Sequence, residues 1–242
     1  MTSQTIGHIE ILPDPLTLAR HVAEWLAGAA LAARGPFRVS LAGGSTPKTL
    51  YSLLAADEFR QRFPWPLVSW YWGDERFVPY DDPQSNYRMA REAMLAEAPV
   101  PPENIHPVPV DGTPEDAARR YERILQEAYG AATLDPARPL FDVTLLGLGS
   151  DGHTASLLPG EPVLEERKRW VAVVSHGRPE IRITMTYPLI ESSRRVAFLV
   201  AGSEKSAILR EIRNGGSRAP AARVRPRGEL LWFVDRAAAG RR

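Results

Sequence analysis

The sequence contains 242 residues, of which 44% are hydrophobic and 24% are charged, a composition typical of soluble globular proteins. Thirty basic and 29 acidic residues give a formal net charge of +1, so the overall charge gives no support to nucleic-acid binding. The chain has no cysteine, which excludes disulfide bonds, thiolate metal sites and thiol nucleophiles.

The N-terminal residues, MTSQTIGHIE, lack the apolar core of a signal peptide. No apolar run approaches the ~18 residues of a membrane-spanning helix. We therefore expect a cytoplasmic protein with no membrane partner. Because no repeat, low-complexity tract or break in composition divides the chain, we expect one domain over residues 1–242.

Strand-like apolar runs alternate with segments of helical periodicity along the chain. The pattern predicts strands over 8–12, 37–42, 67–72, 105–110, 141–146, 170–175, 181–186, 196–201 and 230–234. It predicts helices over 15–33, 85–98, 114–129 and 203–213, and one that begins near Thr46 as N-cap with Pro47 as its first residue. This alternation predicts an α/β protein, a three-layer α/β/α sandwich with a mostly parallel, modified Rossmann-like sheet. Aromatic residues gather at 65–72 without a basic stripe, which favours core packing over contact with nucleic acid.

The stretch 141–159, FDVTLLGLGSDGHTASLLP, joins a predicted strand to a glycine-rich turn. Its glycines match G-x-G-x-x-G, a fingerprint of dinucleotide binding. That fingerprint needs a long helix after the turn and an acid at the end of the next strand. Here prolines at 159 and 162 break the chain early, and the next strand ends in Val174-Ser175-His176. We therefore reject the dinucleotide interpretation.

The same turn presents Asp151 two residues before His153. A carboxylate beside an imidazole can fix its tautomer and stabilise its protonated form, which suits a general base near neutral pH. A loop histidine that caps carbonyl groups is the alternative. The pair stands at the end of a strand, where open α/β sheets bind ligands, so we favour the catalytic interpretation.

Three further segments after predicted strands are candidates for binding an anion. A turn of Gly43, Gly44, Ser45 and Thr46 at a helix start offers free backbone N–H groups and the helix dipole to a phosphate. Asp74 and Arg76 follow another strand, and Arg76 together with Arg182 could hold phosphate bidentately. Lys205 stands at a helix start, where the dipole disfavours a cation unless an anion binds there. A capped helix, a solvated loop and a surface lysine are the respective alternatives.

Five motifs resemble those of the 6-phosphogluconolactonases, within the glucosamine-6-phosphate deaminase-like superfamily. They are LAGGSTP (41–47), WGDERFVPYDDPQSNYRMA (72–90), LLGLGSDGHTASLLP (145–159), RITMT (182–186) and AGSEKS (201–206). The resemblance implies hydrolysis of 6-phospho-D-glucono-1,5-lactone to 6-phosphogluconate, the second step of the oxidative pentose phosphate pathway. It implies no metal and no organic cofactor, and it suggests a monomer.

The resemblance also implies a role for each candidate residue. His153 would be the general base that activates water, Asp151 would orient it, and Asp74 would hold substrate hydroxyls or water. The turn 43–46 would bind phosphate. Phosphate or the developing oxyanion would be contacted by Arg76, Arg182 and Lys205. Some relatives carry a histidine in the loop after the D-E-R motif, where Asp82 or a neighbour stands here, so we assign that loop no catalytic histidine.

Two other functions compete with lactone hydrolysis. Glucosamine-6-phosphate deaminases carry a glutamate five residues after the equivalent histidine, whereas this chain has Leu158. Ring opening and isomerisation would lack that acid, so we rank the deaminase lower. A non-catalytic phosphosugar-binding regulator would keep the phosphate turn and the cations, but it would have no reason to keep His153 beside Asp151.

Overall fold

A seven-stranded parallel sheet forms the centre of the computed structural model, which describes residues 7–241. Its spatial order is β1 (His8–Leu12), β10 (Glu229–Asp235), β9 (Arg195–Val200), β6 (Val143–Gly147), β2 (Phe37–Leu41), β3 (Val68–Trp72) and β5 (Ile105–His106). From β2 the chain runs outward to β5, returns to β6 beside β2, and then continues in the opposite direction. The order therefore reverses between β2 and β6, and ligands bind at such a switch point in open α/β sheets.

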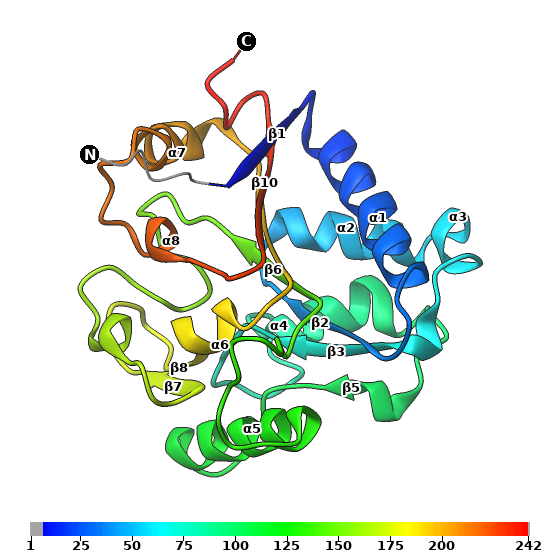
Figure 1. Cartoon of the computed structure of the whole chain (residues 1–242), viewed down its shortest axis with the longest axis vertical. Coiled ribbons are helices and arrows are strands. Elements are labelled where there is room, and N and C mark those ends of the chain that lie inside the picture. Colours follow the sequence, from blue (N-terminus) through cyan, green and yellow to red (C-terminus); the bar gives the residue numbers. More distant parts are fainter. Residues whose placement is uncertain (1–6, 242) are drawn as a thin grey trace.

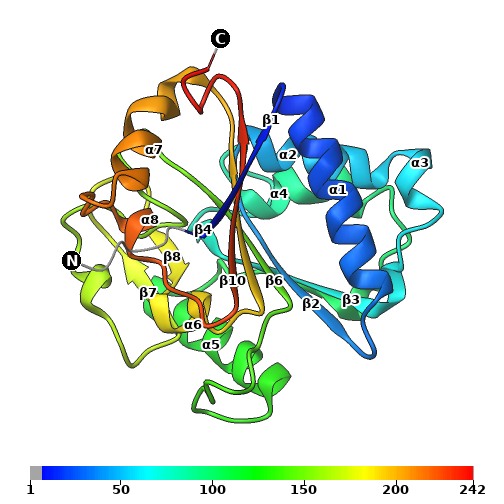
Figure 2. The ribbon, with the colours of Figure 1, turned by 45° about the horizontal axis from the view of Figure 1, so that its top comes forward.

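Helices cover both faces of this sheet (Figures 1 and 2). One face carries α1 (Pro15–Leu31), α2 (Ser45–Ala55) and α3 (Asp57–Arg60). The other carries α6 (Tyr187–Glu191), α7 (Ser206–Arg213) and α8 (Pro220–Arg223), on the left in Figure 2. The predicted three-layer α/β/α class with a mostly parallel sheet is confirmed. No helix in the part of the chain from residue 7 to residue 241 is both long and apolar enough to cross a bilayer.

A second, antiparallel sheet was not expected from the sequence. It consists of β4 (Asp74–Arg76), β8 (Arg182–Met185) and β7 (Val171–Val174), and α5 (Pro114–Tyr129) packs against it. The polar run after β3 is therefore partly a strand and not wholly a loop. Its register places Asp74 opposite Thr184 and Arg76 opposite Arg182. Ladder hydrogen bonds and burial outweigh the polarity of three charged residues in sequence.

The start of α2 corrects the predicted N-cap. The helix begins at Ser45 and its N-cap is Gly44, so the assignment of Thr46 as N-cap is wrong. Gly44 has φ = 105°, a conformation that glycine adopts without steric cost. The helix can therefore begin two residues earlier than predicted. Ser45 and Thr46 therefore belong to the first turn of the helix.

Two other segments differ from the sequence pattern. The helix expected over 85–98 is α4 (Asn86–Ala90), capped by the Ser85 hydroxyl, followed by a π-helical turn, Arg91–Leu95. The glycine- and proline-rich segment 214–227 contains α8. Short 3₁₀ turns occur at Trp65–Leu67, Pro102–Asn104, Pro162–Glu165 and Ser203–Lys205.

The predicted packing of the aromatic cluster is confirmed. Trp65, Trp70, Tyr71 and Trp72 are all at most 2% exposed. The α5 helix is capped at both ends: the Thr113 hydroxyl accepts the N–H of Asp116, and Gly130 ends the helix with φ = 77°. This packing and capping help to hold in place the strands whose carboxyl ends carry the candidate site.

Candidate active site

Four neighbouring strands bring most of the predicted residues to one edge of the main sheet. The Gly43–Thr46 turn follows β2, Asp74 and Arg76 follow β3, and Asp151 and His153 follow β6. Lys205 follows β9. Because β9, β6, β2 and β3 lie side by side and run in the same direction, their carboxyl ends share an edge.

Asp151 and His153 form a hydrogen-bonded pair in the turn after β6. The Oδ1 atom of Asp151 accepts hydrogen bonds from the backbone N–H of His153 at 3.1 Å and from its ring Nδ1 at 2.5 Å. Burial acts to raise the pKa of Asp151, but hydrogen bonds from Arg178 and His153 outweigh it and hold the pKa below the ordinary value. The carboxylate is therefore ionised at neutral pH and keeps the proton on Nδ1, which leaves Nε2 as the basic nitrogen.

Arg178 completes this pair and had no signal in the sequence. Its guanidinium donates to Asp151 Oδ2 at 2.7 Å and lies 3.3 Å from His153 Nδ1. The residue comes from the connection between β7 and β8, far from the catalytic turn in sequence. Because Asp151 is bound on both oxygens, it has little freedom to turn away from the imidazole.

The backbone of the turn is closed by two hydrogen bonds. The N–H of Gly149 donates to the carbonyl of His153, and the N–H of Gly152 donates to the carbonyl of Gly149, both at 2.9 Å. A Cβ on Gly149 would lie 2.0 Å from His153 Nδ1, closer than any real contact. Gly147, two residues earlier, has open space around it. Glycine at 149 is thus required by the imidazole that packs over it.

We expect Gly149→Ala to lower kcat by about tenfold or more, because the methyl group must displace the imidazole and ångström-scale misplacement is costly in catalysis. Gly147→Ala is the matched control and should keep near wild-type turnover. Steady-state kinetics of the two variants checks this. Equal rates for both would show that the packing of His153 over Gly149 does not matter for turnover.

Asp74 links the segment after β6 to the Gly43–Thr46 turn. Its Oδ2 accepts the Ser156 hydroxyl at 2.6 Å, and its carbonyl accepts the side-chain N–H of Asn86 at 2.9 Å. The side chain of Asn86 in turn lies so close to Gly43 that a Cβ there would be 2.1 Å from Asn86 Oδ1. Ser156 and Asn86 were not singled out in the sequence, since single polar residues in a loop and at a helix start carry no distinctive signal.

Arg76 and Arg182 face one another across β4 and β8. Arg76 Nη1 donates to the carbonyl of Gln84, and Arg182 Nη2 lies 3.6 Å from a carboxylate oxygen of Glu180. The Nε of each arginine is buried without a hydrogen-bond partner among the described residues. Burial lowers the pKa of Arg182, Asp74 opposes this shift, and Arg76 adds to it. An oxyanion bound beside these two guanidinium groups would offset their like charges and accept hydrogen bonds from their unused N–H groups.

A family model described as glucosamine-6-phosphate isomerases/6-phosphogluconolactonase matches residues 13–232. The chain belongs to this family. A 6-phosphogluconolactonase of Nostoc is 41% identical over 239 residues, covering 95% of this chain and 96% of that protein. One from Rattus norvegicus is 36% identical and covers 99% and 95%.

Solved structures agree with this assignment. A 6-phosphogluconolactonase from Thermotoga maritima superposes with a TM-score of 0.80 at 32% identity, covering 94% of this chain and 99% of that one. One from Trypanosoma brucei gives 0.82 at 30% identity, covering 97% and 98%. A monomeric glucosamine-6-phosphate deaminase gives 0.81 at 21% identity, which indicates a shared fold alone.

Lys205 is the predicted residue that the structure ties least to the others. It lies in the 3₁₀ turn that precedes α7, and its ion-pair partner is Glu204 at 3.9 Å. Lys205 shares the sheet edge with the turn that carries Asp151 and His153. Among the described residues its ion pair is with Glu204, and not with Asp151, His153 or the two arginines. Its part in phosphate binding stays a prediction.

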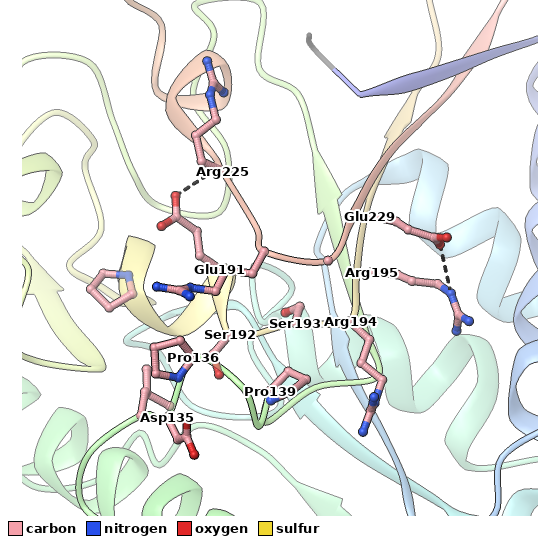
Figure 3. A pocket seen from close by; sticks show the side chains of 14 residues that line it. Asp135, Pro136, Pro139, Glu191, Ser192, Ser193, Arg194, Arg195, Arg225 and Glu229 are labelled. Atoms are coloured by element: carbon pink, nitrogen blue, oxygen red, sulfur yellow. Dashed lines mark hydrogen bonds and ion pairs between the residues drawn. The ribbon is translucent and has the colours of Figure 1, made fainter. Parts of the chain in front are cut away.

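A cavity of about 780 Å³ lies elsewhere, at the amino ends of β9 and β10 (Figure 3). Arg195 and Glu229 pair across it at 3.2 Å, and Glu191 accepts the backbone N–H of Arg225. None of the predicted site residues lines this cavity. The candidate active site lies at the other, carboxyl edge of the sheet, where the predicted residues gather. Residues 7–241 contain no group of three or more acidic or histidine side chains placed to bind a metal.

Proposed function

We propose that the protein hydrolyses 6-phospho-D-glucono-1,5-lactone to 6-phospho-D-gluconate, the second step of the oxidative pentose phosphate pathway. The observation that carries this proposal is the Asp151–His153 pair on β6, beside the phosphate turn on β2 at the switch point of the sheet. Such an arrangement supplies a base and an anion anchor at the ends of two neighbouring strands. Membership of a family whose close relatives are lactonases supports the same chemistry.

The reaction follows from the tautomer of His153. Nε2 accepts a proton from water while the water oxygen bonds to the lactone carbonyl carbon. The tetrahedral intermediate then collapses, the bond from this carbon to the ring oxygen breaks, and the imidazolium returns its proton to that oxygen. General-base catalysis of this type contributes roughly 10²–10⁴-fold. The ionised Asp151 stabilises the imidazolium while it exists.

The phosphate group supplies binding energy away from the reacting carbon. In this proposal the backbone N–H groups of the Gly43–Thr46 turn bind it, with Lys205 as a further cation. Arg76 and Arg182 bind the phosphate or stabilise the oxyanion, where each donor is typically worth ~10²–10³ in rate. Asp74 holds substrate hydroxyls or water, and its charge raises the pKa of Arg182. No metal or organic cofactor takes part.

Leu158 argues against the deaminase reaction. It stands where the deaminases carry an acid and is 1% exposed, packed in the core beside the turn. The buried leucine offers no group for the proton transfers of ring opening. A regulator without activity is disfavoured by the Asp151–His153–Arg178 arrangement, which a binding protein would not need. The expected single domain, the monomeric state and the cytoplasmic location stay predictions.

Two substrates distinguish these functions. Purified protein is expected to release acid from 6-phosphogluconolactone and to release no ammonia from glucosamine 6-phosphate. Both are measured with the same preparation, by proton release and by an enzymatic ammonia assay. Ammonia release without acceleration of lactone hydrolysis would overturn the proposal in favour of the deaminase.

A further inference from the structure

Glu75 is a buried carboxylate that the proposed mechanism does not use. It stands between Asp74 and Arg76 on β4 and is 1% exposed. Burying a carboxylate is costly unless its oxygens are hydrogen-bonded, so its retention between two site residues calls for a physical reason.

Four donors surround the Glu75 carboxylate. Oε1 accepts the backbone N–H groups of Arg76 at 2.8 Å and Asn86 at 2.7 Å. Oε2 accepts the N–H of Tyr87 at 2.7 Å and the hydroxyl of Ser85 at 3.1 Å. Only an ionised carboxylate accepts on both oxygens without presenting a donor of its own. These bonds fasten β4 to the first turn of α4.

Asn86 is one of the residues that this carboxylate holds. Its side chain donates to the carbonyl of Asp74 and occupies the space beside Gly43. One chain of contacts thus runs from Glu75 through Asn86 to the phosphate turn, while Arg76 is held by the same carboxylate. The turn after β2 and the arginine pair of the small sheet belong to different sheets, and Glu75 joins the two.

We propose that Glu75 is a positioning residue that holds Asn86 against the Gly43 turn and so sets the spacing between this turn and the Arg76–Arg182 pair for binding an anionic ligand. The proposal rests on the proposed function in one respect, the anion-binding role of these two groups. It assigns no contact between Glu75 and the ligand.

The electrostatics of Glu75 support this role and give it a pH dependence. Burial raises the pKa of Glu75 to about 7, the hydrogen bonds from Asn86, Tyr87 and Arg76 oppose this, and Asp74 adds to the rise. The residues that face Glu75 from the surrounding elements are Asp74 and Arg76 on its own strand, Tyr80 in the next loop, Tyr121 on α5 and the apolar Ile183 on β8.

Protonation of Glu75 would turn one acceptor into a donor that opposes a backbone N–H. Anion affinity should therefore weaken as the pH falls through about 7. The free energy of unfolding has the opposite pH dependence. Because the pKa in the folded state is raised, the stabilisation from the protonated form is complete below the ordinary value of 4.5 and is lost as the pH rises through about 7. Above about pH 7 the folded protein thus carries an ionised Glu75 carboxylate at a cost in stability.

The test compares Glu75→Gln with Glu92→Gln. Glu92 is an exposed glutamate on the following turn that pairs with Arg88, so it controls for loss of one negative charge. For Glu75→Gln we expect the Kd for sulfate and the KM for the lactone to rise about tenfold, a size expected of a residue that acts through another. We expect kcat to change by less than about twofold, because the dyad is untouched. Glu92→Gln should match the wild type.

The proposal is overturned if Glu75→Gln binds sulfate as tightly as the wild type, or if it loses kcat without a rise in Kd. Should this variant fail to fold, the wild-type Kd for sulfate between about pH 8 and about pH 6 decides, since sulfate stays a dianion there. We expect weaker binding at the lower pH. Protonation of a histidine would add positive charge and strengthen binding, so a constant or stronger affinity overturns the proposal, as does the absence of sulfate binding. Sulfate binding without lactone hydrolysis would instead contradict the proposed function alone.

Discussion

Replacement of His153 by alanine is expected to lower kcat by at least about a hundredfold, with only a modest change in KM. The variant loses the nitrogen that accepts the water proton, whereas the phosphate turn and the arginine pair stay in place. The ring is held by Asp151, whose other oxygen is held by Arg178. The rate is measured by coupling the product to a dehydrogenase.

His176→Ala is the matched control for this experiment. His176 lies exposed in the connection after β7, close in sequence to Arg178 but without a recorded partner in the described chain. Its removal should leave kcat within about twofold of the wild type. Near wild-type turnover in His153→Ala would place the base elsewhere and contradict the assigned dyad.

Replacement of Arg182 by methionine is expected to weaken binding of 6-phosphogluconate by roughly tenfold to a hundredfold, the range for a lost hydrogen bond to a charged group. The melting temperature should change little. Arg182 faces Arg76, and its buried Nε has no partner within the described protein, so removing the charge relieves repulsion and an unsatisfied donor. Arg182→Met should therefore lower the affinity for 6-phosphogluconate without lowering the melting temperature.

The rise in melting temperature on adding 6-phosphogluconate measures this affinity directly, because a ligand that binds the folded state alone stabilises it by mass action. Arg194→Met serves as the control, since Arg194 is 62% exposed in its side chain and lies at the opposite edge of the sheet. Arg182→Met should show a much smaller ligand-induced rise than either the wild type or the control. An unchanged rise would remove Arg182 from the binding site.

Much of the fold could be inferred from the sequence because its strands are local, apolar and ended by glycine. The runs at 37–42, 67–72, 141–146 and 196–201 all became strands of the main sheet, with bounds shifted by one or two residues. The small sheet escaped prediction because β4 consists of three charged residues, whose burial depends on a partner strand a hundred residues away. No local pattern encodes that pairing.

The candidate site divides in a similar way. Asp151 and His153 are two residues apart, so their interaction could be inferred from spacing alone. Arg178, Ser156 and Asn86 reach the site through the tertiary fold, and each is a common polar residue in an unremarkable segment. The N-cap at Thr46 was wrong because a positive φ at Gly44 lets the helix start earlier, and a glycine before a serine does not by itself reveal its conformation.

The most direct test of the central claim is the decay of 6-phosphogluconolactone, generated in situ, in the presence of catalytic amounts of the purified protein. We expect the rate to rise in proportion to protein concentration, to saturate with the lactone and to exceed spontaneous hydrolysis by orders of magnitude. A rate that stays at the spontaneous value at every protein concentration would contradict the assignment of lactone hydrolysis to this site.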